Sequence, residues 1–208
     1  MQYTCGTNKD KIEILLPEGE SKNILYAISG GADSAILLYI LAKMNKESGN
    51  KHKFTLFTVP RPDGGANYSP KIVDWIANKL QVELPEPMIV GDGNLPHQIV
   101  VKVVIRELLD SNKYDVLYVA ENKIPPTKLD GLAPIRAPQP GYKRITLPFW
   151  AVTKDSIIDL YYQENVQELL ELTHTCTEWT VGRCNKCFQC NERAWAFTQL
   201  GIVDPGTA

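Results

Sequence analysis

A short run rich in glycine and serine, Ser29–Ser34, has the residue types of a phosphate-binding loop and reads Ser-Gly-Gly-Ala-Asp-Ser. Glycines let the backbone approach phosphate oxygens closely and adopt dihedrals that side chains forbid. A helix beginning here adds unpaired N–H groups and roughly half a positive charge. Asp33 suits helix capping or a magnesium ion. An ordinary glycine turn is the competing interpretation, but the full string is expected by chance in on the order of one chain in several thousand.

Four cysteines near the C-terminal end have the spacing of a metal site, because Cys176, Cys184, Cys187 and Cys190 form C-x7-C-x2-C-x2-C. Two-residue gaps let thiolates converge on one ion at about 2.3 Å each, and four of them complete a tetrahedral zinc site. The spacing favours zinc. Disulfides and an iron–sulfur cluster are the alternatives, and spacing alone does not exclude the second. Since four thiolates already saturate zinc, we expect a structural or surface role for His174.

The elements expected around these residues alternate between strands and helices. Residues 23–28 are short and apolar, as in a buried strand, and lead into Ser29–Ser34 and a helix over 33–44. Ser69, with Pro70 after it, is expected to cap a second helix, and Thr153 a later one. The remaining segments are strands over 54–59, 88–90, 115–120 and 145–147 and helices over 97–110 and 154–162. The alternation predicts an α/β fold with a doubly wound parallel sheet.

Length, charge and hydropathy limit the classes of function. The chain has 208 residues and a formal charge of -2. This length suits one domain over 1–208, and the charge argues against a nucleic-acid partner. No apolar run approaches the roughly 20 residues that cross a bilayer, and the N-terminus lacks the layout of a secretory signal. We therefore expect a cytoplasmic protein with no membrane partner, in which thiols stay reduced.

The phosphate-loop string resembles the signature of the N-type ATP pyrophosphatases, or PP-loop enzymes. These enzymes bind ATP through its pyrophosphate and typically adenylylate a substrate oxygen. The resemblance implies an adenine nucleotide alpha hydrolase-like, Rossmann-like fold and magnesium bound with ATP. It also implies that adenine lies near the end of the second strand. The implied ATP-binding residues are Ile28, Ser29, Gly30, Gly31, Ala32, Asp33, Ser34, Ala35, Thr58 and Val59.

The C-terminal part is similar to the 7-cyano-7-deazaguanine synthases of the queuosine pathway. The similarity rests on Leu-Pro-Phe at 147–149, Thr-Lys-Asp at 153–155 and the cysteine run within 174–193, and with the phosphate loop it frames residues 23–197. It implies an ATP-dependent ligase that joins ammonia to the carboxylate of 7-carboxy-7-deazaguanine and then dehydrates the amide to the nitrile. It further implies structural zinc in the segment 174–197 and a homodimer. The implied catalytic residues are Asp33, Ser34 and Lys154.

Basic residues on two loops are candidates for binding an anionic substrate. The segment 121–144 has five prolines and no periodicity, and loops of this length in compact domains are usually functional lids or disordered. With the loop after residue 59, it should lie near the carboxyl ends of the strands, where such sheets bind ligands. Solvated loop charges are the competing interpretation. The candidates are Arg61, Lys123, Arg136, Lys143 and Arg144.

Two other functions stay open, because the middle of the chain departs from the synthase pattern at residues 94–97 and 121–126. One is a different PP-loop enzyme, a sulfur transferase or amide-forming ligase acting on another nucleobase or on tRNA. A sulfur transferase needs a cysteine free to carry persulfide or a labile cluster, so metal analysis separates the two. The other is a non-catalytic nucleotide-binding zinc module, which would show no ATP cleavage with any candidate substrate.

Overall fold

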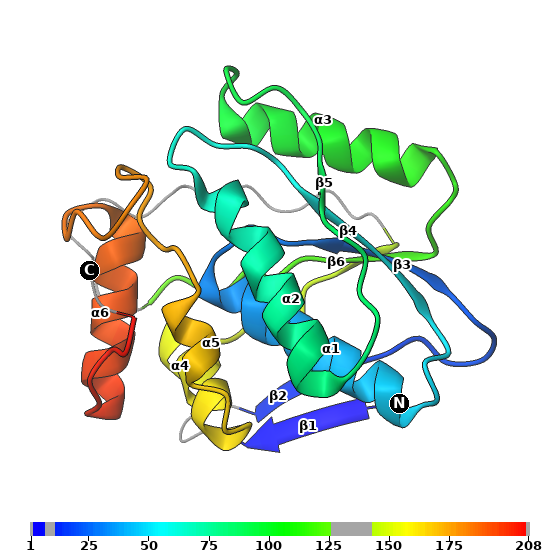
Figure 1. Ribbon diagram of the computed structural model, residues 1–208, viewed down its shortest axis with the longest axis horizontal. Helices are drawn as coiled ribbons and strands as arrows, with labels where there is room; N and C mark the ends of the chain where they lie inside the picture. The colour runs from blue at the N-terminus through cyan, green and yellow to red at the C-terminus, as the bar shows by residue number, and fades with distance from the viewer. Residues whose placement is uncertain (1, 7–10, 126–142, 207–208) are drawn as a thin grey trace.

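A five-stranded parallel sheet forms the centre of the molecule (Figure 1). The structure is a computed structural model that describes residues 2–6, 11–125 and 143–206. The strands lie in the order β5-β4-β3-β6-β7, and each neighbouring pair is parallel. Their bounds are β3 Asn23–Ala27, β4 Lys53–Thr58, β5 Met88–Ile89, β6 Val116–Tyr118 and β7 Ile145–Thr146.

Helices cover both faces of this sheet. α1 (Ala32–Glu47) and α2 (Ser69–Leu80) pack on one face, and α3 (His97–Asp110) packs on the other (Figure 1). Successive side chains of a strand point to opposite faces, so Leu25 packs with the α3 core while Tyr26 packs with the α1 core. The predicted α/β fold with a doubly wound parallel sheet is confirmed.

The strand order changes direction beside β3, and this places the phosphate loop. From β3 the chain moves outward to β4 and β5, then returns through α3 to β6 on the other side of β3. In such sheets the crevice at the carboxyl ends of the strands, at the point of reversal, is the usual ligand site. Ser29–Ser34 directly follows the carboxyl end of β3, so the topology sets it in that crevice.

α1 is buried nearly all round, as its sequence indicates. Its residues 35–42 are at most 6% exposed, because a second layer of elements covers the side of α1 away from the sheet. This layer consists of α4 (Lys154–Gln163), α5 (Glu168–Glu171), α6 (Phe188–Leu200) and the hairpin of β1 (Gln2–Gly6) and β2 (Lys11–Leu15). The layer also fixes the start of α1, since the buried Tyr161 hydroxyl donates to the Ala32 carbonyl at 2.5 Å.

Several local features differ from the sequence-based expectation. Ser69 begins α2 but does not cap it, because a 3-10 turn, η1 (Gly65–Tyr68), runs directly into the helix and Tyr68 occupies the cap position. The Ser69 hydroxyl instead donates to the Ile28 carbonyl at 3.3 Å. β1, η1, α5 and α6 were not expected. Across 2–6, 11–125 and 143–206, no helix has the length and apolar character of a membrane span.

Candidate active site

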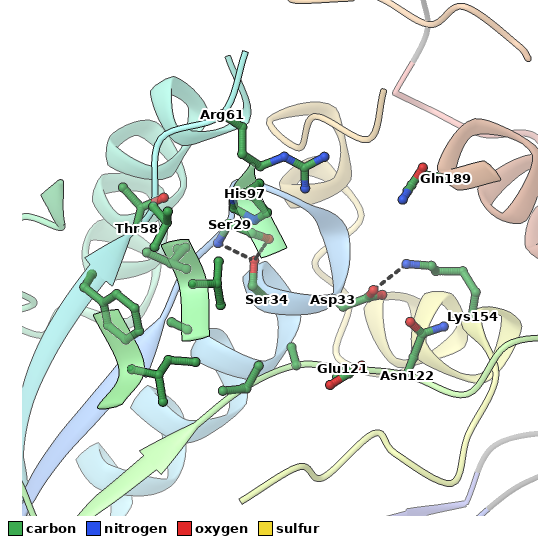
Figure 2. Close-up of a pocket in the computed structure, with 18 of the residues that line it drawn as sticks. Ser29, Asp33, Ser34, Thr58, Arg61, His97, Glu121, Asn122, Lys154 and Gln189 are labelled. Atoms are coloured by element: carbon green, nitrogen blue, oxygen red, sulfur yellow. Dashed lines mark hydrogen bonds and ion pairs between the residues drawn. The ribbon is translucent and has the colours of Figure 1, made fainter. Parts of the chain in front are cut away.

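The phosphate loop is held in shape by its own two serines. The Ser34 hydroxyl donates to the Gly31 carbonyl at 3.0 Å and accepts from the Ser29 amide at 3.2 Å, while the Gly31 amide reaches the Ser29 hydroxyl at 3.3 Å. Figure 2 shows Ser29 and Ser34 side by side at the start of α1. The first N–H groups of a helix have no intrahelical acceptor, and no side chain caps α1. The loop thus presents backbone donors and a helix N-terminus to one crevice.

Gly30 is the loop position where no other residue fits. Its φ is 79°, and a Cβ there would lie 2.1 Å from the Gly65 carbonyl oxygen. We expect Gly30→Ala to lower the melting temperature and to abolish ATP binding, because the loop must move away from η1. The matched control is Gly49→Ala, at φ 85° with open space around the new Cβ. That variant carries only the backbone strain of about 1–2 kcal/mol, a fall of about 2–8 °C.

Calorimetric titration of each variant with magnesium and a non-cleavable ATP analogue, beside thermal unfolding, measures this difference. Gly49→Ala should bind the analogue as the wild-type chain does. If Gly30→Ala also bound it normally, the close approach of the loop to η1 would have no part in nucleotide binding.

A cavity of about 380 Å³ opens beside the loop, between the sheet and α3. Its inner wall is apolar and suits the flat face of a purine ring; Ile28, Phe57, Val59, Val101, Ile105 and Val119 form it. Thr58, which is 3% exposed, contributes a buried hydroxyl that has no hydrogen-bond partner. Thr58 and Val59, which the sequence resemblance implies as neighbours of adenine, both line this cavity.

His97, at the start of α3, also lies in the cavity and has a buried Nδ1 without a hydrogen-bond partner (Figure 2). Burial lowers the pKa of His97, and the nearby Arg61 guanidinium lowers it further. The imidazole is therefore neutral near pH 7. It adds a second unpaired polar atom to the cavity wall, and it comes from residues 94–97, where the chain departs from the synthase pattern.

The charged end of the cavity is built on a buried lysine. Lys154, the first residue of α4, is 7% exposed and pairs with Asp33 Oδ2, while Glu192 Oε2 lies 3.5 Å from its Nζ. Figure 2 shows Lys154 and Asp33 pointing toward each other. Burial alone would lower the pKa of Lys154, but Asp33 and Glu192 raise it more, so its ammonium persists above neutral pH. Asp33 Oδ1 is buried and has no hydrogen-bond partner.

Two members of this charged end were missed in the sequence. Glu192 comes from α6, and the Asn122 amide donates to its Oε1 at 2.9 Å. Glu192 follows the cysteine run on a helix that was not expected, and Asn122 follows β6. The sequence did not indicate either residue as part of the site, since only the tertiary fold brings them to Lys154.

A second, smaller pocket of about 130 Å³ adjoins the first and shares Lys154 with it. Both pockets are lined by Ser29, Asp33, Arg61, Ala120, Lys154 and Gln189. The smaller one also reaches Gly31, Gly65 and the segment 174–177, which enters the cysteine cluster. His174 is buried, stacks on Tyr68 with ring centroids 4.6 Å apart, and donates its backbone N–H to the Gly30 carbonyl at 2.9 Å. It is therefore not a surface residue.

The four predicted metal-ligand cysteines converge, and their Sγ atoms all lie within 4.8 Å of one another. Backbone amides donate to these sulfurs, for example Trp179 N to Cys176 Sγ at 3.3 Å. Burial tends to raise the pKa of the Cys187 thiol, but hydrogen bonds from Thr177 and Cys190 bring it down to about 6. Cys187 also occupies the N-cap position of α6, where a helix dipole favours a thiolate. Four buried thiols this close fit a metal ion.

The five basic candidates do not gather at one place. Arg61 lines both pockets, with a nitrogen 2.6 Å from Asp63 Oδ2. Arg144 lies at the amino ends of the strands, away from the pockets, where its guanidinium donates to the Leu109 carbonyl at 2.7 Å. Its expected position was wrong because it directly precedes β7, and the amino end of a parallel strand faces away from the crevice. Lys143 precedes it, the Lys123 side chain lines neither pocket, and Arg136 lies outside the described residues.

Among known proteins, only solved structures show similarity to this chain. No protein-family model matches the chain, and no curated protein matches it. The U34-tRNA thiolase NcsA from Methanococcus maripaludis, with its 4Fe–4S cluster, is similar with a TM-score of 0.48 and 14% sequence identity. The match covers 87% of this chain and 66% of the thiolase chain. At this identity and TM-score, it says nothing of what this chain binds.

Proposed function

We propose that this chain is an ATP-cleaving enzyme of the PP-loop type, which transfers AMP to an oxygen of its substrate. The observation that carries the proposal is the buried lysine at the junction of the two pockets. Lys154 stands beside a phosphate loop, between a purine-sized apolar cavity and a smaller polar pocket. A buried cation with two carboxylates is costly to fold, and such groups cluster where charge develops during a reaction.

In this proposal ATP spans the two pockets. Adenine lies on the apolar wall near Thr58, and the phosphates lie against the N-terminus of α1. Asp33 Oδ1, which has no hydrogen-bond partner, holds the magnesium ion that accompanies ATP. The Lys154 ammonium faces the phosphate that is attacked and offsets the negative charge that grows there.

The finer proposal names the substrate as 7-carboxy-7-deazaguanine. Its support is the sequence similarity at 147–149, 153–155 and 174–193. A carboxylate oxygen attacks the α-phosphorus of ATP, the bond to the β-phosphate oxygen breaks, and pyrophosphate leaves. Ammonia then attacks the carboxyl carbon, AMP leaves with that oxygen, and a proton is released. In the second round the amide oxygen takes AMP from another ATP. Pyrophosphate leaves in that step, and loss of AMP and of both N–H protons from the resulting imidate ester then leaves the nitrile.

We further propose that the cysteine cluster holds one zinc ion with a structural role. In a tetrahedral site with bonds of about 2.3 Å, neighbouring sulfurs lie about 3.8 Å apart, and all four sulfurs here are within 4.8 Å. A four-iron cluster places each thiolate on a different iron and requires a wider set of sulfurs. Four cysteines leave no open position on zinc, so the ion supplies order rather than chemistry.

The direct test incubates the purified chain with magnesium, ATP, ammonia and 7-carboxy-7-deazaguanine, followed by mass spectrometry of base and nucleotide. We expect AMP and pyrophosphate from ATP, and the nitrile or the intermediate amide from the base. The control is Ser29→Gly/Asp33→Asn, which removes loop donors and the free carboxylate oxygen. ATP binding without a change in the base would reject the deazaguanine substrate and keep the PP-loop proposal. If the chain neither bound nor cleaved ATP, the whole proposal would fall.

A specific contact favours sulfur transfer as the second candidate. Cys176 belongs to the wall of the smaller pocket, so the cysteine cluster adjoins the pocket that the phosphate loop also lines. A thiolate in that position could pass sulfur to an adenylylated carbonyl if it carried persulfide or a labile cluster. Anaerobic purification with analysis of metal and acid-labile sulfide separates the candidates. Stable zinc near one ion per chain supports the ligase, while iron and sulfide in equal amounts support sulfur transfer.

A further inference from the structure

We infer that His174 binds the pyrophosphate part of ATP in the smaller pocket, so that the cysteine-bearing segment is itself part of the nucleotide site. This inference rests on the proposed function and names a ligand that the phosphate-loop motif does not contain. His174 lies 144 residues beyond Gly30 in sequence (174 − 30), and its backbone N–H donates to the Gly30 carbonyl at 2.9 Å.

The His174 ring is fixed in place and has one buried nitrogen, Nε2, without a hydrogen-bond partner. The residue is 7% exposed, and its stacking on Tyr68, with an angle of 15° between the rings, fixes the ring plane. The Tyr68 hydroxyl in turn donates to the Thr180 carbonyl at 3.0 Å, which anchors the stack. His174 Nε2 is buried without a hydrogen-bond partner, and the residue lines the smaller pocket. A buried imidazole nitrogen without a partner is costly unless a bound molecule supplies one.

The lining of the smaller pocket selects pyrophosphate over a base. At about 130 Å³ it is about a third the size of the cavity beside it. The N-terminus of α1 enters it through Gly31 and Ala32, and Arg61 and Lys154 bring two cations. Helix N-termini, guanidinium and ammonium groups are the donors that phosphate oxygens prefer. His174 Nε2 adds a polar atom without a partner to this set.

Two carboxylates also lie on this wall, and both are accounted for. Asp63 accepts the Gly65 amide at 2.9 Å through Oδ1 and pairs with Arg61 through Oδ2. Asp33 pairs with Lys154 through Oδ2 and leaves only Oδ1 without a hydrogen bond. The one remaining carboxylate oxygen suits the magnesium ion that bridges phosphate oxygens. The ligand of this pocket is therefore magnesium pyrophosphate, free or as part of ATP.

The test measures the two halves of ATP separately. Calorimetric titrations with magnesium pyrophosphate and with AMP compare the wild-type chain with His174→Phe, which keeps the stacked ring but removes the donor. We expect about tenfold weaker pyrophosphate binding, the effect of one lost hydrogen bond to a charged group, with AMP binding changed less than twofold. His174→Gln places an amide near the position of Nε2 and should recover most of the affinity.

Thr58→Val is the reciprocal variant, because Thr58 lines the larger cavity but not the smaller pocket. It should weaken AMP binding and leave pyrophosphate binding unchanged. Metal content is measured for every variant. If His174→Phe binds pyrophosphate normally, the inference is overturned while the proposed function stands. The same holds if the variant loses pyrophosphate binding only when it also loses its bound metal. A wild-type chain that binds neither ATP nor pyrophosphate overturns both.

Discussion

Lys154→Met is expected to slow AMP release by about 10²–10³-fold, the usual cost of removing one group that stabilises a developing negative charge. Methionine keeps the length and apolar stem of lysine, so the change removes mainly the ammonium. The wild-type ammonium stays charged because Asp33 and Glu192 raise the pKa of Lys154 against the effect of burial. The initial rate of AMP release with saturating ATP, ammonia and base substrate is the measurement.

The same variant should also be less stable, and a second change separates stability from rate. Removing one partner of a buried ion pair costs about 3–5 kcal/mol, because the remaining carboxylates are left without a cation. Lys154→Met/Glu192→Gln removes one of those charges and should regain part of the melting temperature without regaining AMP release. Lys79→Met, at an exposed lysine 4.0 Å from Glu168, is the surface control. Full AMP release by Lys154→Met would exclude the lysine from the chemistry.

Cys187→Ser is expected to remove the metal and, with it, the order of the segment from 174 to the end of α6. A structural zinc ion contributes on the order of 10 kcal/mol to local folding. Loss of α6 releases Glu192 and Gln189 from the pockets, so ATP cleavage should be lost as well. Metal per chain by mass spectrometry and hydrogen exchange over 174–200 measure the two effects.

Acid should also release the metal, because protons compete with the metal ion for the cysteine thiolates. The pKa of Cys187 is lowered from an ordinary 9.0 to about 6, so the folded chain favours its thiolate. The stability gained from this group is complete above pH 9 and is lost as the pH falls through about 6. Cys5→Ser, at the cysteine outside the run, is the control and should keep its metal. A chain that kept its fold without metal would contradict the structural role.

The parts of the site that could be predicted from sequence are those that are contiguous in sequence. Ser29–Ser34 carries its glycines, serines and acid within six positions, and the three last cysteines of the cluster fall within seven, so local spacing was enough. The strands and helices around them were predictable for the same reason, since apolar runs bounded by turns alternate along the chain. The residue range 97–110 of α3 matched at both ends.

Residues that belong to the site only through tertiary contacts could not be predicted. Glu192 and Asn122 meet across 70 positions, and the orientation of His174 depends on its stacking with Tyr68, from a turn that was not expected. Arg144 is the opposite case. It was expected near the carboxyl ends of the strands because it lies in a long loop, but it directly precedes β7 and so lies at the amino end of that strand. Predicting where such residues lie requires the three-dimensional path of the chain, and hydrophobic periodicity does not give that path.

The ion pair between Asp33 and Lys154 joins residues 121 positions apart, and this bears on the order in which the protein becomes competent. A ribosome makes β3, the phosphate loop and α1 early, and these can pack before the later residues exist. Glu192, Gln189 and all four cysteines of the cluster emerge after the last strand of the sheet, β7. During synthesis and after any stress that loosens α6, the chain thus passes through a state with a finished sheet and an open crevice. Because long-range contacts form slowly, we expect the contacts that complete the candidate site to form late in folding.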